Sequence, residues 1–258
     1  MIFAGIDVGS RSSKIILWDH SRQTILARGC VDQGVAQRRL AAELLDRLLA
    51  QQVLSRHDLR GIVATGYGRN LIDFADTTIT EITCHAHGVL HGQPSARTIV
   101  EIGGQDSKSI RLDPRGQVRD FAMNDRCAAG TGRFLEMVAT RLGVPLEDLG
   151  NLARQSQAKV TISSMCVVFA ESEIIGLLAS GRHPGDLVAA VQSSIAARVA
   201  AMSGRNLDSP VLFTGGVALV PGMAEALETT LARPVRVATE PLFTGALGAA
   251  LLAARQNS

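Results

Sequence analysis

The sequence predicts an α/β protein made of two duplicated lobes with a ligand-binding cleft between them. Strand-like and helical segments alternate along 258 residues, which suffice for one large domain or two smaller lobes. A turn of the form acid-x-Gly, followed by Ser-Lys, occurs twice: Asp7-x-Gly9 with Ser13-Lys14, and Glu101-x-Gly103 with Ser107-Lys108. The spacing from acid to lysine is the same in both copies, which is typical of internal duplication. Clefts between lobes are where ligands usually bind.

The first lobe is predicted to open with a meander of three strands and to close with helices. Residues 2–18 form two strands joined by a Gly/Ser turn, and residues 25–31 form a third. Leucines at helical spacing predict a helix over residues 39–51. A short buried strand at residues 62–65 and helical material up to about Gly92 complete the segment. We place lobe I at residues 1–94, completed by a C-terminal helix at residues 243–258.

The second lobe, at residues 95–242, repeats this order. Strands are predicted at residues 98–102, 107–112 and 118–123, separated by the turns 103–106 and 113–116. Helices are expected to dominate residues 134–205. A late strand at 211–214 ends in Gly215-Gly216, and a helix at 223–231 and a strand at 235–238 follow.

The composition excludes several classes of partner. The formal net charge is only +2, the basic residues are scattered, and the chain has one Trp and one Tyr. A nucleic-acid surface or a base-stacking platform is therefore not expected. The N-terminus lacks the basic start and long apolar core of a signal peptide, and the longest apolar stretch, residues 245–254, is too short to span a bilayer. We predict a cytoplasmic protein without a membrane partner.

Two of the four cysteines have a setting that suits metal ligands. Cys127 and Cys166 each stand at the apparent start of a helix after a polar turn, where the helix dipole favours a thiolate. Two thiolates are too few for a zinc site or an iron–sulfur cluster, which normally have four protein ligands, so a symmetric dimer would supply them. Cys30 and Cys84 are predicted to be small buried residues. A metal role for the histidines is not expected, since their spacing does not place them on one helical face: His85, His87, His91.

Both strand–turn–strand segments have the chemistry of a phosphate cradle. Glycines let the turn approach a ligand closely, and consecutive N–H groups form an anion nest. In the first turn the hydroxyls of residues 10, 12 and 13 add donors and Lys14 adds charge, although the chain has no Walker motif. Asp7 is expected to hold a magnesium ion through water, and Glu101 to do the same from the second lobe. Gln105 or Asp106 would orient an attacking water.

These motifs resemble those of a known superfamily. The segments Asp7-x-Gly9-Ser10, Gly103-Gly104-Gln105-Asp106 and Thr214-Gly215-Gly216-Val217 are similar to the phosphate and adenosine motifs of the acetate/sugar kinase, Hsp70 and actin superfamily. The cysteine segments 124–136 and 164–173 resemble more narrowly the ATP-dependent activators of 2-hydroxyacyl-CoA dehydratases, with benzoyl-CoA reductase ATPase subunits as close relatives. The resemblance covers nearly the whole chain.

The resemblance implies the fold of that superfamily, with MgATP in the cleft between the lobes of each chain. It implies a homodimer with one [4Fe-4S] cluster held by Cys127 and Cys166 of both subunits. Reduced ferredoxin or flavodoxin would donate one electron, which ATP hydrolysis would drive on to a partner dehydratase or reductase. The nucleotide would be bound by residues of the matching motifs: Gly9, Ser10, Arg11, Ser12, Ser13, Lys14, Gly103, Gly104, Gly130, Thr131, Gly132, Gly215, Gly216 and Val217.

The chain departs from the family pattern at three positions. Glu101 stands where Asp is usual, Arg11 where a small hydroxyl residue is usual, and Val220 where Asn often ends the adenosine motif. Arg11 would add a phosphate contact or point outward. Two alternatives remain open: a small-molecule kinase of the same fold, acting on a sugar or acid with Asp106 or Asp125 as base, and a zinc-stapled dimer with regulatory nucleotide binding.

Overall fold

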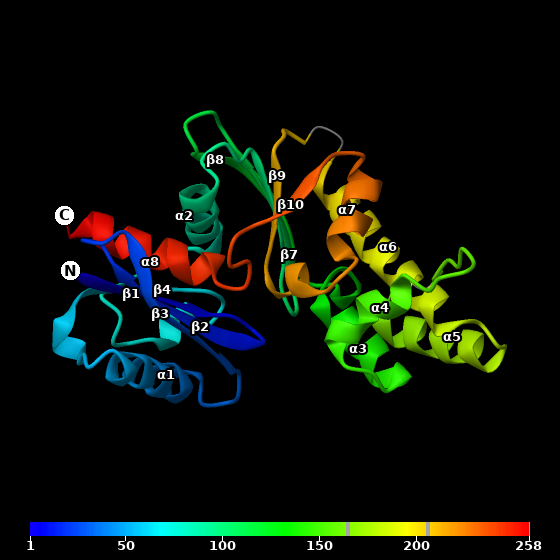
Figure 1. Ribbon diagram of the computed structural model, residues 1–258, viewed down its shortest axis with the longest axis horizontal. Helices are drawn as coiled ribbons and strands as arrows, with labels where there is room; N and C mark the ends of the chain where they lie inside the picture. Colours follow the sequence, from blue (N-terminus) through cyan, green and yellow to red (C-terminus); the bar gives the residue numbers. More distant parts are fainter. Residues whose placement is uncertain (164–165, 205–206, 258) are drawn as a thin grey trace. The chain divides into compact units, whose positions relative to one another are not determined.

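The computed structural model describes residues 1–163, 166–204 and 207–257 (Figure 1). The chain divides into two compact units. The first comprises Met1–Ser95, Arg115–Val118 and Ala238–Ser258, and the second comprises Ala96–Pro114 and Arg119–Val237. The N-terminal unit thus includes the C-terminal segment of the chain.

The first unit is built on a five-stranded mixed sheet in the order β3-β2-β1-β4-β5. Its strands are β1 (Ile2–Val8), β2 (Ser12–Asp19), β3 (Thr24–Asp32), β4 (Leu59–Thr65) and β5 (Thr77–Thr78). Its helices are α1 (Gln37–Gln51), α2 (Glu81–Gly92) and α8 (Thr244–Gln256), with short 3-10 turns at Arg56–Asp58 and Arg69–Leu71. The central strand β1 is antiparallel to β2 and parallel to β4.

The second unit repeats this arrangement with the order β10-β9-β6-β7-β8. Its strands are β6 (Thr98–Ile102), β7 (Ser107–Leu112), β8 (Val118–Asn124), β9 (Val211–Thr214) and β10 (Val235–Val237). Its helices are α3 (Gly132–Leu142), α4 (Leu149–Ala153), α5 (Val167–Ala179), α6 (Pro184–Ser203) and α7 (Met223–Leu231). Short 3-10 turns lie at Ala128–Gly130, Leu146–Asp148 and Gly216–Leu219.

The two sheets have the same topology, which confirms the predicted duplication. Strand β6 takes the place of β1, being antiparallel to its hairpin partner β7 and parallel to β9. Asp7 pairs with Lys14 across the first hairpin, and Glu101 pairs with Lys108 across the second. The repeated spacing in the sequence therefore reflects one register used twice.

Small residues bring α8 close to both the sheet and α2, and α2 and α8 lie side by side in Figure 1. A side-chain carbon on Gly248 would lie 1.7 Å from the Cys84 carbonyl oxygen, and one on Gly88 would lie 2.0 Å from the Thr244 carbonyl oxygen. On the strand β1, Gly5 faces the backbone of α8 in the same way. A side-chain carbon on Gly5 would lie 2.0 Å from the Ala246 carbonyl oxygen. Backbone atoms cannot yield as flexible side chains do, so this layer requires glycine.

We expect Gly248→Ala to destabilise the protein by about 3 kcal/mol or more, because the added methyl overlaps the α2 backbone. The matched control is Gly176→Ala. Gly176 is also a helical glycine, but a carbon there meets nothing within 4 Å. The control should stabilise by about 0.5–1 kcal/mol, since alanine has the higher helix propensity. Urea unfolding of both variants measures the difference, and equal midpoints would contradict the packing.

The core of the second unit is a single cluster that joins the sheet to its helices. Val100 and Ile102 of β6 and Phe213 of β9 pack with residues of α3, α5 and α6, among them Phe134 and Val191. Glu101 alternates with Val100 and Ile102 along β6, so its side chain lies on the other face of the sheet.

The predicted helical region 134–205 is interrupted. Residues 154–163 contain no helix, and residues 164–165 and 205–206 lie outside the described chain. Cys127, predicted at the start of a helix, is the N-cap residue of the short 3-10 turn Ala128–Gly130, and the α-helix α3 begins only at Gly132. The prediction for Cys166 is confirmed, since it is the N-cap residue of α5. Among the described helices, none has the length and apolar character needed to cross a membrane.

Candidate functional site

The first glycine turn joins β1 to β2 and is closed by two hydrogen bonds. Gly9 N–H donates to the Ser12 carbonyl over 3.1 Å, and the side-chain amide of Gln33 donates to the Gly9 carbonyl over 2.8 Å. Lys14 Nζ reaches back to the Ser12 carbonyl at 3.3 Å. The ammonium group therefore lies at the turn, where the sequence predicted a positive charge.

Strand alternation divides the predicted hydroxyl donors between two faces of the sheet. Ser12 and Lys14 share a face with Ile16 and Trp18, which pack under α8, whereas Ser13 shares a face with Ile15, which packs toward α1. Ser13 is fully buried, and its Oγ has no hydrogen-bond partner within the described structure. Ser10 is partly exposed, so it and the turn amides are better placed for a ligand than Ser13.

Arg11 is at the exposed tip of the turn. Its side chain is 49% exposed and lies 3.8 Å from the Asp32 carboxylate, and its carbonyl accepts a hydrogen bond from Gln33 N–H. Of the two roles expected from the sequence, the outward orientation agrees with this exposure.

Asp7, the second-to-last residue of β1, is a buried carboxylate, 8% exposed, that lies between two glycines. A side-chain carbon on Gly66 would lie 2.6 Å from Asp7 Oδ1, and one on Gly245 would lie 3.0 Å from Oδ2. Gly66 also has φ of +90°, which side chains rarely adopt. Lys14, which pairs with Asp7 across the hairpin, directs its ammonium to the Ser12 carbonyl.

In the second hairpin, unlike the first, the lysine binds carboxylates. Lys108 is 2% exposed and donates to Glu101 Oε2 over 2.9 Å and to Asp106 Oδ2 over 2.7 Å. Position 106 corresponds to Ser12 of the first hairpin, which offers the lysine only a carbonyl. The extra carboxylate of Asp106 explains why Lys108 is locked in an ion-pair triad whereas Lys14 is not.

Glycines from three segments of the second unit meet beside Glu101. A carbon on Gly215, which has φ of +90°, would lie 2.7 Å from Glu101 Oε1, and one on Gly103 would lie 3.3 Å from the same atom. Gly132 N–H donates to the Gly103 carbonyl over 2.9 Å, and a carbon on Gly132 would lie 3.1 Å from Val217. The structure thus brings together the second hairpin, the turn after β9 and the start of α3, as the sequence predicted.

The other predicted residues of this region have varied settings. Gly104 accepts a hydrogen bond from Arg133 N–H, and Gln105 is exposed at the tip of the turn. Thr131 is fully buried and caps α3, with its hydroxyl accepting from Arg133 N–H and donating to the Ala128 carbonyl. Gly130 is buried against Asn124 and Arg198. Gly216 begins the 3-10 turn that follows Gly215.

Cys127 is half-buried in a loop that Asn124 holds. The Asn124 side chain accepts from Cys127 N–H over 3.0 Å and donates to the Cys127 carbonyl over 2.8 Å. These two bonds fix the backbone around the thiol in extended geometry, with φ of −120°. The backbone that carries the thiol is therefore held by a side chain three residues upstream.

Cys166 is exposed at the start of α5, and carboxylates anchor the segment that leads to it. Ser163 donates from its backbone N–H and its hydroxyl to Glu173 of α5, both over 2.8 Å. Further upstream, Asp186 of α6 accepts hydrogen bonds from residues 156, 157 and 158, which hold the pKa of its carboxyl below the usual value. The predicted motif residues Ser164 and Met165 lie outside the described residues.

The remaining cysteines differ from each other. Cys84 is buried as predicted, and burial raises the pKa of its thiol to about 12, so it stays protonated. The prediction for Cys30 is wrong, because it is exposed. It lies on the edge strand β3, where residues 28, 30 and 32 form an exposed alternating face. None of the four cysteines forms a disulfide.

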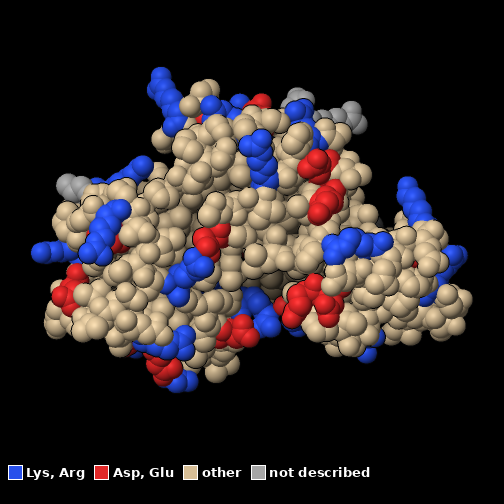
Figure 2. Space-filling view, viewed as in Figure 1, with Lys and Arg blue, Asp and Glu red and all other residues tan. Residues whose placement is uncertain are grey.

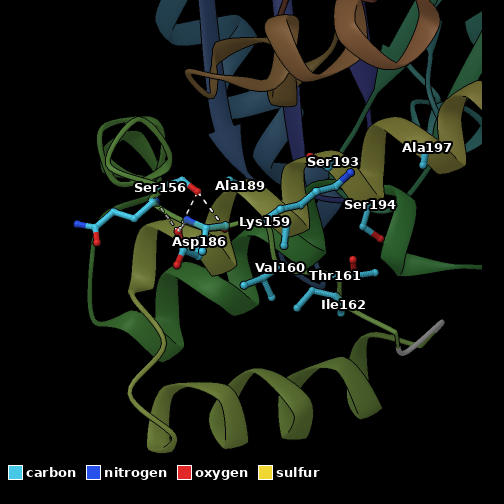
Figure 3. A pocket seen from close by; sticks show the side chains of 13 residues that line it. Ser156, Lys159, Val160, Thr161, Ile162, Asp186, Ala189, Ser193, Ser194 and Ala197 are labelled. Carbon is cyan, nitrogen blue, oxygen red and sulfur yellow. Dashed lines mark hydrogen bonds between the residues drawn. The ribbon is translucent and has the colours of Figure 1, made fainter.

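A cavity of about 610 Å³ lies between the segment 156–162 and α6, and Figure 3 shows the side chains that line it. Its lining on α6 consists of alanines and serines together with Asp186, which is occupied by the hydrogen bonds described above. None of the predicted site residues lines this cavity. On the face shown in Figure 2, the described basic and acidic side chains are interspersed.

Comparison with known proteins places this geometry in a family. Residues 4–253 match the model of the BadF/BadG/BcrA/BcrD ATPase family. The chain belongs to this ATPase family. The match includes both glycine turns, both cysteine loops and the turn after β9, so the duplicated hairpins are part of a shared ATPase architecture.

Members of the family that resemble this chain include activators of dehydratases. The activator of lactoyl-CoA dehydratase of Anaerotignum propionicum is 43% identical over 98% of this chain and 97% of its own. The (R)-2-hydroxyglutaryl-CoA dehydratase activating ATPase of Acidaminococcus fermentans is 41% identical over 96% of this chain and 95% of its own. The structure of the Clostridium difficile 2-hydroxyisocaproyl-CoA dehydratase activator with bound ADPNP has a TM-score of 0.94 at 39% identity and covers 100% of this chain and 96% of that one. The actin-like fold predicted from the sequence is thereby confirmed.

The sequence did not reveal the residues around Asp7. Gly66, His85 and Gly245 stand 59 or more positions from Asp7 along the chain and reach it only through β4, α2 and α8. The local signal that could have pointed to this site was the motif Gly66-Tyr67-Gly68, which directly follows the strand predicted at residues 62–65.

Proposed function

We propose that this chain is an ATP-hydrolysing, iron–sulfur-containing activator that passes a low-potential electron to a partner 2-hydroxyacyl-CoA dehydratase or a related reductase. The proposal is carried by one observation above all: the thiols of Cys127 and Cys166 are both accessible, in a chain that matches dehydratase activators over nearly its full length. The duplicated glycine turns supply the reason for ATP.

ATP phosphates are the ligand that the glycine turns suit. The N–H groups of Gly9 and Gly103 close their own turns, and the next N–H group in each turn, at residues 10 and 104, is the donor that we assign to an anion, together with Lys14. The start of α3 and the turn at Gly215–Gly216 add further close backbone approach. ADPNP is bound in the related Clostridium difficile structure.

Asp7 is the better candidate for contact with magnesium, through water as proposed from the sequence. Its carboxylate is buried, and Lys14, its partner across the hairpin, directs its ammonium to the Ser12 carbonyl. Glu101 and Asp106 share Lys108, which already compensates part of their charge. We therefore assign the cation to Asp7, and we assign to Glu101 and Asp106 the ordering of the second turn, where Gln105 is free to meet a water.

The donor set of the two cysteine loops fits one half of a four-thiolate cluster site. Cys127 and Cys166 are both accessible, and neither forms a disulfide. Cys84 has a raised pKa and is buried, so it is unsuited to ligation. A [4Fe-4S] cluster held by these positions of two subunits would supply one-electron chemistry, with a potential set by hydrogen bonds and solvent exposure.

Homodimer formation has support on α5. Val168 and Phe169 lie two and three residues after Cys166 and are 67% and 70% exposed, and Ile175 is 47% exposed. A helix start that exposes two large apolar side chains beside a thiol suits a contact with a second copy, since apolar interface cores exclude water. Reduced ferredoxin or flavodoxin is the proposed donor to this dimer, and the dehydratase or reductase is the acceptor.

The alternative functions find less support. A kinase would need a free carboxylate as base, whereas Asp106 is bound to Lys108 and Asp125 lies at 4.0 Å from Arg126 at the surface. A zinc-stapled dimer would use the same thiols but would give no reason for ATP hydrolysis by the family.

Anaerobic purification and metal analysis test the proposal. We expect a brown protein with about four iron atoms per dimer, an absorbance that air bleaches, and Mg²⁺-dependent ATP hydrolysis without an added acceptor for phosphate. Stoichiometric zinc in place of iron would favour the stapled dimer. A colourless, metal-free protein that phosphorylates a sugar or acid would favour the kinase.

A further inference from the structure

A buried histidine stands beside the Asp7 carboxylate, on a helix outside the glycine-turn motifs. His85 lies on α2 and is 6% exposed. A side-chain carbon on Gly245 would lie 3.0 Å from Asp7 Oδ2 and 3.2 Å from His85 Nε2. The two atoms therefore face the same small space, which the glycine keeps open at the start of α8.

The other ring nitrogen of His85 is held by α8. Nδ1 lies 2.9 Å from Thr244 Oγ1, and both side chains are buried. The Thr244 hydroxyl also lies 3.4 Å from the Pro241 carbonyl. The 2.9 Å contact can form in either tautomer. We assign the tautomer in which the Thr244 hydroxyl donates to Nδ1 and the ring hydrogen is on Nε2, because Nε2 faces a carboxylate, which accepts hydrogen bonds.

This tautomer directs an N–H donor toward the side of Asp7. A buried carboxylate requires hydrogen-bond donors, and a donor beside one oxygen restricts the orientation of the whole group. Lys14 does not serve this purpose, because its ammonium is turned to the Ser12 carbonyl. In the second hairpin the corresponding acid, Glu101, is held by Lys108.

We propose that His85 is a positioning residue for Asp7, and that the chain Thr244–His85 holds the Asp7 carboxylate in the orientation that meets the magnesium ion of the nucleotide. The inference rests on the proposed function, in which Asp7 faces that ion. It assigns to α2 and α8 of the first unit the task that Lys108 performs within the second hairpin.

Amide substitutions separate the two ring nitrogens. In His85→Gln the amide reaches the position of Nε2, and in His85→Asn it reaches only the position of Nδ1. We expect His85→Asn to raise the Mg²⁺ concentration for half-maximal ATP hydrolysis about tenfold or more, and His85→Gln to raise it about threefold or less. His87→Asn is the matched control on the same helix, because His87 faces Arg255 and should leave the Mg²⁺ requirement unchanged.

Calorimetry of ADP binding with and without Mg²⁺ gives a readout independent of turnover. His85→Asn should weaken the binding of MgADP and leave the binding of ADP in EDTA unchanged, whereas general loss of structure would weaken both. If His85→Asn does not fold, Thr244→Val keeps the shape and removes the hydroxyl, and it should raise the Mg²⁺ requirement severalfold.

The failures of the two proposals are distinguishable by measuring Asp7→Asn in parallel. If Asp7→Asn loses the Mg²⁺ dependence while His85→Asn and Thr244→Val keep wild-type values, the role of His85 is refuted and that of Asp7 stands. If Asp7→Asn also behaves as wild type, the magnesium assignment itself is wrong. Equal effects of the Asn and Gln variants at position 85 would show that bulk, rather than the Nε2 position, matters.

Discussion

Replacing Cys166 by alanine is expected to remove the iron from the anaerobically purified protein while leaving nucleotide binding intact. The thiol is exposed at the start of α5, and it is one of two accessible cysteines in the loops that the family resemblance assigns to the cluster. Loss of one thiolate from each subunit leaves two ligands for a site that needs four. We expect iron to fall from about four atoms per dimer to a small fraction of that, with loss of the brown colour.

The matched control for this prediction is Cys30→Ala. Cys30 is also an exposed thiol, but it lies on the edge strand β3 of the first unit. Its replacement should keep the iron and the colour. Retention of iron by Cys166→Ala would exclude Cys166 as a ligand. Loss of iron from both variants would indicate that iron retention does not depend specifically on Cys166. Binding of MgADP, measured by calorimetry, should be the same in all three proteins.

Replacing Asp7 by asparagine is expected to lower Mg²⁺-dependent ATP hydrolysis by about 100-fold or more. The amide has nearly the same shape and fits between Gly66 and Gly245, but it removes the charge that would meet the cation. Because the asparagine side chain occupies the same space as the aspartate side chain, we expect the backbone of the first turn to keep its conformation. The measurement is steady-state phosphate release over a range of Mg²⁺ concentrations.

Asp19→Asn is the control for removing a buried carboxylate from the same sheet. Asp19 is 8% exposed, as Asp7 is, but it lies at the opposite end of the β1–β2 hairpin and accepts hydrogen bonds from Ser21 and Arg22. The Asp19→Asn substitution should lower the stability of the protein and leave turnover per folded molecule close to that of the wild type. Full turnover of Asp7→Asn would contradict the assignment of Asp7.

Local patterns carried most of the architecture. The acid-to-lysine spacing of the two hairpins predicted the duplication because hairpin register depends on turn length, which is written in adjacent residues. The polar residues before Cys166 predicted the start of α5, because a helix start is also marked by adjacent residues. Predictions that depended on what packs against an element were less accurate. Cys30 proved exposed because it lies on the exposed face of β3, and Ser13 proved buried because alternation turns it toward α1.

The two glycine turns, the acids Asp7 and Glu101 near the ends of β1 and β6, and the candidate ligands Cys127 and Cys166 could be read from the sequence, since each depends on residues close together in the chain. Which of the two acids is held by its hairpin lysine became visible only in the folded units. Asp7 differs from Glu101 because the first hairpin lacks a second carboxylate to draw in its lysine, and because α2 and α8 bring His85 and Gly245 to the end of β1. The distances between those groups depend on how closely Gly88 and Gly248 allow the two helices to approach, and helix packing of that kind is a property of the folded unit.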